Sequence, residues 1–307
     1  MNRPPVALFA WRRPDHLRRV LESLEANPEA METDVIAYCD APAKPEHQDG
    51  CKQVRDLLRE SWGFRSLQVV ERELNLGLAG NIVSGVTETV QTHGRAIVLE
   101  DDLVVSPAFL GWMGHAMDLY ADVPEVASVH GYWYPVPQAV PDSFFLRGAD
   151  CWGWGVWERS WRVFQPDGAA LLAEIERRGL EWSFDGDGSF PYVPMLRGQI
   201  EGRNDSWAIR WHASTFLAGM YTLFPGRSLV ANIGADGSGS NHVERDERYT
   251  VELALEAPPL VEQPPREDPR VRSLLSDHHA RSMGRSVLLR RLRNCFHLSR
   301  WEKGVSP

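Results

Sequence analysis

Short apolar runs alternate with amphipathic stretches along the first 135 residues. The apolar runs predict buried strands over 4–11, 33–40, 66–73, 95–102 and 126–135. Between them, apolar residues recur at helical spacing, as Leu17, Val20 and Leu21 do. This spacing predicts helices over 13–27, 50–62, 75–93 and 106–122. Ser106 followed by Pro107 is typical of a helix start and predicts the beginning of the last helix.

Strands that alternate with helices in this way predict an α/β fold, with a mostly parallel sheet and helices on both faces. Functional groups of such sheets gather where the strands reach their carboxyl ends. Asp40 ends the second predicted strand, and Glu100, Asp101 and Asp102 end the fourth. We therefore expect a site at this edge of the sheet.

The pattern changes twice farther along the chain. We expect one domain over 1–255, with an α/β half over 1–135 and a loop-rich, substrate-binding half over 136–255, where Gly, Trp and acidic residues are frequent. Proline-rich residues 256–269 predict a linker, and 270–307 a basic helical tail. A basic amphipathic helix can lie on an anionic membrane surface. The alternative is a terminal helix packed on the body of the protein.

Composition narrows the classes of protein that fit. The 307 residues carry a formal net charge of −9, and the pI of about 5.6 argues against nucleic acid as the main partner. No apolar run is long enough for a signal sequence or a membrane span, and the four cysteines are scattered, so a reduced cytoplasmic setting is the expectation. The twelve tryptophans fall partly in two clusters, which suits either core packing or flat sugar faces.

Three adjacent carboxylates at a strand end need a partner for their charge. Divalent cations such as Mg²⁺ and Mn²⁺ are held by one or two carboxylates together with the oxygens of a bound phosphate. Glu100, Asp101 and Asp102, here called the acid trio, therefore predict a metal and diphosphate site. The alternative is a solvated acidic turn.

At this point the sequence resembles a known family. The stretches that carry the likeness lie between positions 9 and 242 and read FAWRRPDHLRRVLESL, AYCD, NLGLAGNIVSG, IVLEDDLVVSPAFL, CWGWGVW, DSWAIRW and NIGADGSGSNH. In this order they resemble inverting glycosyltransferases of the GT-A fold, related to family 2 and to the N-acetylglucosaminyltransferase I group, where EDD replaces the usual DxD metal motif. The resemblance implies a Rossmann-like GT-A sheet and a nucleotide-sugar donor, with UDP as the expected nucleotide. It also implies that 1–135 is the nucleotide-sugar-binding half and 136–255 the acceptor-binding half.

The resemblance also implies roles for single residues. Asp102 would ligate Mn²⁺ or Mg²⁺, while Glu100 and Asp101 would hold sugar hydroxyls and the water shell of the metal. Asp40 would accept a hydrogen bond from a uracil-like base. The remaining donor-binding residues would be Arg12, Asn75, Gly77 and Asn81. Asn75 and Gly77 fit a purely structural tight turn equally well.

Inverting transfer needs a carboxylate that takes a proton from the acceptor hydroxyl. In the resembling family an Asp beside a Trp has this position, which indicates Asp205 in GRNDSWAIRW. Glu158, in an apolar setting that could raise its pKa, is an alternative base, as are Asp185 and Asp187. Asp185 and Asp187 lie in the stretch FDGDGSF, whose glycines predict an exposed loop. Phe190 stands where a calcium loop needs Gly, which argues against a calcium site.

His242 is a candidate second metal ligand. Many enzymes of this fold supply a late His from a mobile loop, and the glycines of NIGADGSGSNH would give such a loop its freedom. Asp236 is a weaker candidate in the same stretch. The tryptophans Trp152, Trp154 and Trp207 are expected to line the acceptor side, with a buried aromatic turn as the alternative.

These observations predict a metal-dependent inverting glycosyltransferase acting on a glycan, lipid-linked or small-molecule acceptor. A nucleotidyltransferase is one alternative, although the Arg pair of AWRRPDH lacks the glycines expected after its first strand. A carbohydrate-binding protein without activity is another, and it would bind sugar without metal or nucleotide. A retaining transferase of the same fold would differ in the anomer of its product.

Overall fold

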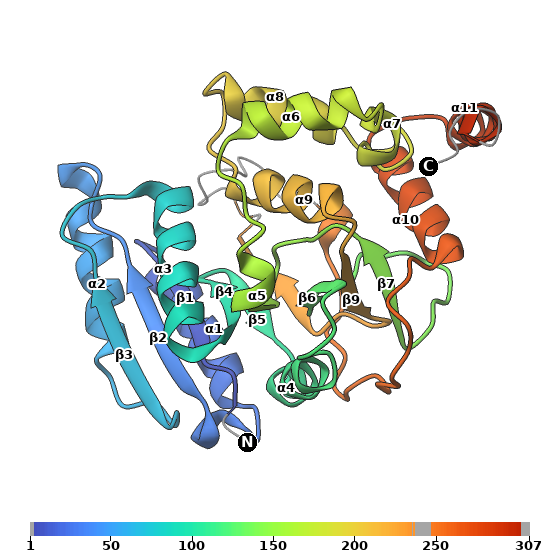
Figure 1. Ribbon diagram of the computed structural model, residues 1–307. Helices are drawn as coiled ribbons and strands as arrows, with labels where there is room; N and C mark the ends of the chain where they lie inside the picture. Colours follow the sequence, from blue (N-terminus) through green and yellow to red (C-terminus); the bar gives the residue numbers. More distant parts are fainter. Residues whose placement is uncertain (1–2, 235, 237–246, 302–307) are drawn as a thin grey trace.

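The computed structural model describes residues 3–234, 236 and 247–301 and has a mixed sheet of eight strands at its centre (Figure 1). The order across the sheet is β3-β2-β1-β4-β8-β6-β9-β7. The strands are β1 (Val6–Ala10), β2 (Asp34–Cys39), β3 (Ser66–Glu71), β4 (Arg95–Glu100), β6 (Val126–His130), β7 (Ser143–Arg147), β8 (Trp154–Trp157) and β9 (Tyr221–Pro225).

The first four strands of this order are all parallel. β8 runs antiparallel to both β4 and β6, β9 is parallel to β6, and β7 is antiparallel to β9. Only β8 and β7 therefore run against the common direction of this sheet. The predicted α/β class with a mostly parallel sheet is confirmed.

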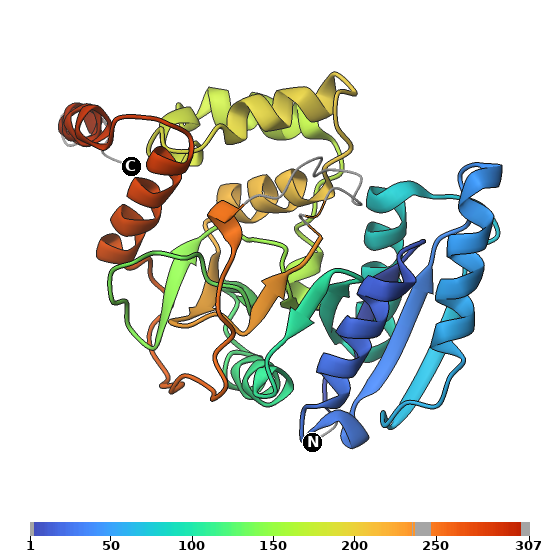
Figure 2. The ribbon, with the colours of Figure 1, turned by 180° about the vertical axis from the view of Figure 1, so that it is seen from behind.

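Helices cover both faces of the sheet, as Figures 1 and 2 show from opposite sides. The helices are α1 (Pro14–Glu25), α2 (Gln48–Leu58), α3 (Gly77–His93), α4 (Phe109–Leu119), α5 (Glu158–Trp161), α6 (Gly168–Arg177), α7 (Glu181–Phe184), α8 (Tyr192–Ile200), α9 (Trp207–Leu217), α10 (Pro269–Ser282) and α11 (Val287–Trp301). The core of one face contains residues of α1, α2 and α4, and the core of the other contains residues of α3 and α9. A strand between two such layers has no face in water. This explains why β1 is apolar at every position.

The tryptophan cluster belongs to the core of the second face. Trp154 and Trp207 are 1% and 3% exposed, and their rings stack with centroids 5.5 Å apart. Trp161 and Trp211 pack against the same ring of Trp154. This corrects the expectation that Trp154 and Trp207 face an acceptor, because both rings are used to join β8 to α9. Trp152 is half-buried and packs edge-on against Tyr132.

Trp154→Ala is expected to destabilise the fold by about 3–5 kcal/mol, because it removes a large side chain from a closely packed layer. Trp152→Ala is the matched control and should cost clearly less, since its ring is only half-buried. Denaturant unfolding of both variants measures the difference. Equal losses of stability in the two variants would contradict the assignment of Trp154 to the packed core.

The second half contains more helix than its composition predicts. Residues 168–217 form α6, α7, α8 and α9, which share a small apolar core of their own around Ile175 and Leu196. Two of these helices have side-chain N-caps: Asp167 accepts from the backbone of α6, and Ser206 accepts from that of α9. The expected loop-rich half therefore contains a helical lobe.

The acid trio is followed by a short second sheet. Residues Leu103–Val105 form β5, which pairs antiparallel with β10 (Val230–Asn232). This pairing explains why the sequence becomes apolar again directly after the carboxylates. Ser106 does not begin a helix as predicted. Its hydroxyl accepts from the backbone N–H of Ala108 at 3.0 Å within a turn, and α4 starts at Phe109.

The proline-rich segment 256–269 lies against the body of the protein. Gln263 exchanges hydrogen bonds with the Tyr120 hydroxyl and contacts Ser143, and Glu267 forms an isolated bridge with Phe145 of β7. Asp268 then caps α10 by accepting from two backbone N–H groups. The predicted linker is thus held against the body of the protein by hydrogen bonds at Gln263, Glu267 and Asp268.

The basic tail is divided into two helices by a left-handed turn at Gly284. Arg290 and Arg291 of α11 both form ion pairs with Asp277 of α10, and the side chains of Asp277 and Arg290 are each 4% exposed. Two of the basic residues are therefore used to hold the tail on itself. Among the described residues, no helix combines the length and the apolar character needed to cross a bilayer.

Candidate active site at the carboxyl edge of the sheet

The acid trio lies where strand order changes direction along the chain. β1 is flanked by β2 on one side and β4 on the other, and Phe9 of β1 pairs with Glu100 of β4. In open α/β sheets this switch point, at the carboxyl ends of the strands, forms a crevice that binds ligands. The segment Trp11–Arg13 therefore leaves β1 directly beside the three carboxylates.

One arginine compensates much of the negative charge of the trio. The Arg13 guanidinium donates to Asp101 and, at 2.8 Å, to Oδ2 of Asp102. The backbone N–H of Trp11 also donates to Asp101 at 3.3 Å. Charge-assisted bonds of this kind make adjacent carboxylates tolerable in a half-buried position. The protein thus places a cation of its own where a metal and a diphosphate were expected.

Among the described residues, Arg13 forms hydrogen bonds with Asp101 and Asp102 but not with Glu100. Burial, followed by the negative charges of Asp102 and Asp101, raises the pKa of Glu100 to about 8. Burial is also the main cause that raises the pKa of Asp101. Glu100 therefore keeps its proton at neutral pH, which lowers the negative charge of the trio.

Glu100→Gln is expected to stabilise the fold increasingly as pH rises. The native state holds the proton of Glu100 to about pH 8, whereas an unfolded chain releases it near the ordinary value of 4.5. Native protein thus binds more protons between these values, so stability falls as pH rises through this window. The variant should gain roughly 1 kcal/mol or more at pH 8 and nothing near pH 4.

Thermal unfolding across that pH range, without added metal, checks the effect. Glu158→Gln is the matched control, because the side chain of Glu158 is 37% exposed and forms an ion pair with Arg162. A gain for Glu100→Gln that does not change with pH would contradict the assignment.

Asp40 and Asn75 tie two loops together at this edge. Oδ1 of Asp40 accepts from the backbone of Leu76 at 2.9 Å, and Oδ2 accepts from the Asn75 side chain at 3.1 Å. Gly77 follows at a φ of +70°, which a residue with a side chain adopts with strain. The structural turn that was the alternative for Asn75 and Gly77 is therefore present. Their role toward a donor stays a prediction.

The amide of Asn81 is satisfied inside the protein. Its oxygen accepts from Arg72 at 3.1 Å, its nitrogen donates to the Tyr38 carbonyl at 3.2 Å, and the residue is 4% exposed. This corrects the expectation that Asn81 lines a donor pocket, since its polar atoms hold α3 against β2. Arg12 is exposed and lies over the ring of Trp11, 4.9 Å from its centroid.

A late segment of the chain passes directly over Asp102. The backbone N–H of Ile233 donates to the Asp102 carbonyl at 2.8 Å. A Cβ atom on Gly234 would lie only 2.1 Å from Oδ2 of Asp102. Farther on, Oδ2 of Asp236 lies 3.1 Å from Nε2 of His16 on α1. His242, the candidate metal ligand, lies outside the described residues.

Gly234→Ala is expected to displace the Asp102 carboxylate, because the added methyl group would occupy the same space. The fold should survive, since the side chain of Asp102 can rotate. Gly114→Ala is the matched control, as its Cβ would meet no atom closer than 3.8 Å. Nucleotide binding with Mn²⁺, measured by calorimetry, should weaken about tenfold in the first variant only. Unchanged affinity would show that the carboxylate is not needed in its present position.

β8 brings a second loop to the same edge. It runs antiparallel to β4, with Trp154 opposite Val98 and Trp157 opposite Arg95. Residues 150–153 therefore enter beside the acid trio. Consistent with this, burial and the charges of Asp150 and Glu100 raise the pKa of the Cys151 thiol.

The same register places Glu158 at the amino end of β4. Five residues separate Arg95 from Glu100, which in a strand is roughly 16 Å. Glu158 is therefore excluded as the base for chemistry at the acid trio. Asp187 forms ion-pair contacts with Arg272, and Asp185 accepts from the backbone of Val193, both within the turn between α7 and α8. FDGDGSF therefore forms a turn, as predicted, but none of its residues is exposed, which corrects the expectation of an exposed loop.

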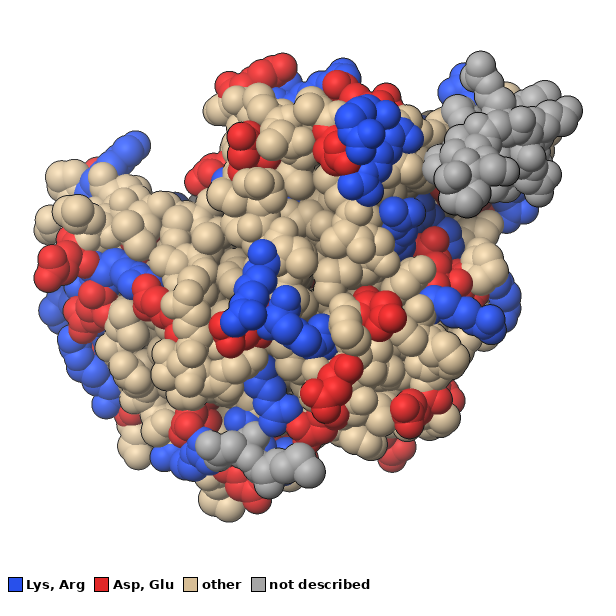
Figure 3. Space-filling model, viewed as in Figure 1, with Lys and Arg blue, Asp and Glu red and all other residues tan. Residues whose placement is uncertain are grey.

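Asp205 precedes α9 on an exposed stretch. Its side chain is 70% exposed and lies 3.5 Å from Arg210. Trp207, two residues later, stacks on Trp154, so Asp205 is carried at the end of the helix that packs on β8. The outline of the molecule is indented between α3 and the lobe of α6 and α8 (Figure 3). The same face mixes acidic and basic side chains, without a field of one sign.

The acid trio suits a divalent cation in its chemistry. Asp101 and Asp102 converge on a single guanidinium, so two carboxylates already aim at one positive charge. Mg²⁺ takes one or two protein carboxylates and completes its shell with phosphate oxygens and water. Within the part of the chain that the structure describes, no three His, Cys, Asp or Glu side chains are grouped to hold an ion without such help.

Sequence reasoning missed two residues at this edge. Arg13 was passed over for Arg12, because adjacent arginines cannot be distinguished until the turn after β1 is known. Asp150 was overlooked beside the tryptophans that follow it. Its only sequence signal was an acid directly before a Cys-Trp-Gly stretch.

No protein-family model and no curated protein sequence matches this chain. Among solved structures, the mannosyltransferase PcManGT from Pyrobaculum calidifontis, in complex with GDP-Man and Mn²⁺, is similar at a TM-score of 0.31 and 16% identity. The match covers 42% of this chain and 35% of that one. TarS of S. aureus matches at a TM-score of 0.30 and 14% identity, over 47% of this chain and 24% of its own.

Proposed function

We propose that this protein is a glycosyltransferase that moves a sugar from a nucleotide-diphospho sugar to a hydroxyl acceptor, with a UDP-linked sugar as the first candidate donor. One observation carries the proposal. At the switch point between β1 and β4, Asp101 and Asp102 converge on a cation, and a late glycine-containing segment covers Asp102. This is the place where an α/β sheet binds a nucleotide. The resemblance of the motifs supports the same assignment.

The chain prepares this edge for a charged ligand. The Trp11 backbone and Arg13 fix Asp101, and Arg13 also reaches Asp102. Asp102, with Asp101 beside it, would hold Mn²⁺ or Mg²⁺. Such an ion supplies positive charge that stabilises a leaving diphosphate. With the carboxylates so engaged, Arg13 would be free to turn toward the phosphates, for which its forked guanidinium is well suited.

The second half would bind the acceptor and provide the base. In an inverting transfer, the acceptor hydroxyl attacks the anomeric carbon as the bond to the diphosphate breaks, and a carboxylate takes the hydroxyl proton. We assign that carboxylate to Asp205, because the resemblance indicates an Asp beside a Trp and its exposed side chain at the start of α9 can be reached by an acceptor. Arg12 and Asp40 remain proposed contacts of the nucleotide. Trp152 remains a proposed contact of the acceptor.

A thermal-shift panel of nucleotide sugars, with and without Mn²⁺, tests the function. A ligand that binds the native state raises its stability by about 2.7 kcal/mol at a hundredfold excess over Kd. We expect a shift for one nucleotide sugar, and only with metal. Stabilisation by free sugars alone would indicate a carbohydrate-binding protein, and stabilisation by a nucleoside triphosphate with a sugar phosphate would indicate a nucleotidyltransferase. The anomer of the product separates inverting from retaining transfer.

A further inference from the structure

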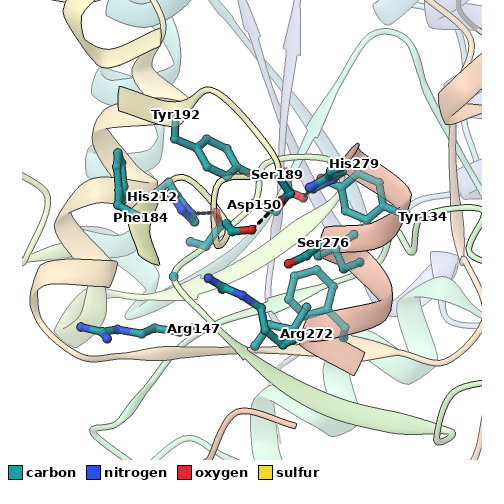
Figure 4. Close-up of a pocket in the computed structure, with 16 residues that line it drawn as sticks. Tyr134, Arg147, Asp150, Phe184, Ser189, Tyr192, His212, Arg272, Ser276 and His279 are labelled. Atoms are coloured by element: carbon teal, nitrogen blue, oxygen red, sulfur yellow. Dashed lines mark hydrogen bonds between the residues drawn. The ribbon is translucent and has the colours of Figure 1, made fainter. Parts of the chain in front are cut away.

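A small pocket lies in the second half, between β7, β9, the α7–α8 turn and α10 (Figure 4). Its volume is about 50 Å³. A water molecule needs at least about 10–15 Å³ of such space, so the pocket holds roughly three or four. That is room for one polar end of a ligand. We call it the Asp150 pocket.

Asp150 is the only carboxylate among the residues that line this pocket in the described structure. Oδ2 accepts from the Tyr134 hydroxyl at 2.6 Å, and Oδ1 accepts from the backbone of Cys151 at 2.8 Å. An ionised carboxylate can accept about four hydrogen bonds, so Asp150 retains capacity for more. The residue is half-buried, and its side chain can therefore be reached from the pocket.

Two histidines of the lining are neutral at physiological pH. Burial lowers the pKa of His212 to about 4 and that of His279 to about 3. Nδ1 of His212 lies 2.8 Å from the Ala149 carbonyl and so must carry the proton, which leaves Nε2 as an acceptor. Nε2 of His279, a residue that is 3% exposed, has no hydrogen-bond partner among the described residues. A buried polar atom without a partner is costly, so a hydroxyl group or a water molecule bound here would stabilise it.

The lining favours an uncharged ligand rich in hydroxyl groups. Two arginines line the pocket among the described residues, and both already have partners: Arg272 donates to the Ser183 carbonyl and to Asp187, and Arg147 donates to the Phe216 carbonyl. Neither guanidinium is therefore free for an anion. A cation in the pocket would contact one carboxylate, Asp150, and would lie near the positive charge of Arg272. Hydroxyl groups can donate to Asp150 and to an imidazole nitrogen, while the aromatic rings of Tyr192 and Tyr134 provide apolar walls.

The pocket is joined to the acid trio by one residue. Asp150 belongs to the pocket, and its neighbour Cys151 lies close enough to Glu100 for the charge of that carboxylate to affect the pKa of the thiol. The loop that carries both residues enters beside β4. The Asp150 pocket therefore lies on the loop that neighbours the proposed site of transfer.

From this geometry we propose that the Asp150 pocket is an acceptor subsite, which binds the hydroxyl-bearing end of an uncharged sugar or other polyol. The designation of this pocket as an acceptor subsite rests on the proposed function. The binding itself does not depend on it. Asp150 is here a binding residue and takes no part in proton transfer.

Saturation-transfer NMR on the full chain tests the proposal, with methyl glycosides of glucose, galactose, mannose and N-acetylglucosamine as probes and without nucleotide or metal. We expect at least one glycoside to bind with millimolar affinity. Asp150→Asn should weaken it about tenfold, since a bond to a charged acceptor is lost. Tyr192→Phe keeps the ring but removes a hydroxyl group whose pKa is raised by burial and by the nearby charge of Asp150. A bound glycoside would lose one polar contact, so binding should weaken, though less than in Asp150→Asn. Tyr221→Phe, at a half-buried tyrosine outside the pocket, is the matched control.

Thermal unfolding of each variant shows whether it folds, and Tyr192→Phe carries the test if Asp150→Asn does not. Absence of any signal from the wild type would overturn the proposal, as would full binding by the folded variants. The two proposals fail separately. Nucleotide-sugar binding without glycoside binding rejects only the subsite, whereas glycoside binding through Asp150 without any nucleotide binding keeps the pocket and rejects the glycosyltransferase.

Discussion

Asp102→Asn is expected to abolish metal-dependent nucleotide binding and to reduce sugar transfer by about a thousandfold. The reason is charge: Asp102 is the carboxylate that both Arg13 and the late segment at Gly234 contact, so it stands at the centre of the proposed site. Loss of one ligand of a metal that stabilises a leaving group removes several kcal/mol from catalysis. Calorimetry with UDP and Mn²⁺, followed by a transfer assay, measures both effects.

Asp15→Asn is the matched control for this substitution. Asp15 is an exposed residue in the first turn of α1, close in sequence to Arg13 but without a recorded bond to it among the described residues. It should behave as the wild type. The Asn at 102 can still accept from Arg13, so the fold should persist. Unchanged nucleotide affinity in the presence of Mn²⁺ would remove Asp102 from the site.

Asp205→Asn is expected to leave nucleotide binding intact while transfer falls by about a hundredfold to ten-thousandfold, the usual contribution of a general base. The exposed position of Asp205 explains the first part, because its removal disturbs no buried contact. Single-turnover kinetics with a saturating donor separate chemistry from binding. The loss should appear in the rate of transfer and not in the donor Kd.

Asp187→Asn serves as the comparison, since Asp187 was an alternative base and is tied to Arg272. Its φ of 58° is tolerated by Asn, so the turn should keep its shape. We expect near-normal transfer from this variant. Normal transfer from Asp205→Asn instead would move the base to another carboxylate.

The first half of the fold could be predicted because most of its strands, apart from the edge strand β3, are covered on both faces. Runs such as VALFA and AIVL have no polar position, and their alternation with amphipathic helices leaves few other arrangements. The edge that carries Asp40 and the acid trio follows from chain direction alone. The compensation of that trio by Arg13 does not, because it depends on the path of three residues after β1.

The tryptophans show where sequence patterns become ambiguous. Trp152 and Trp154 are two residues apart, yet Trp154 lies in β8 and points into a packed layer, while Trp152 lies in the loop before it. Composition alone cannot distinguish a tryptophan ring packed in the core from one that is available to bind a sugar. The helical lobe was missed for a related reason: its helices are short, and their apolar core forms only after α6, α8 and α9 come together.

The central claim is that Asp102 holds a divalent cation against a nucleotide diphosphate. A crystal soaked with Mn²⁺ and UDP, measured at a wavelength where manganese scatters anomalously, tests it most directly. We predict an anomalous peak within coordination distance of the Asp102 carboxylate, with Arg13 turned from Asp102 toward the phosphates. A bound nucleotide with no peak there, and with Arg13 still bonded to Asp102, would contradict the account.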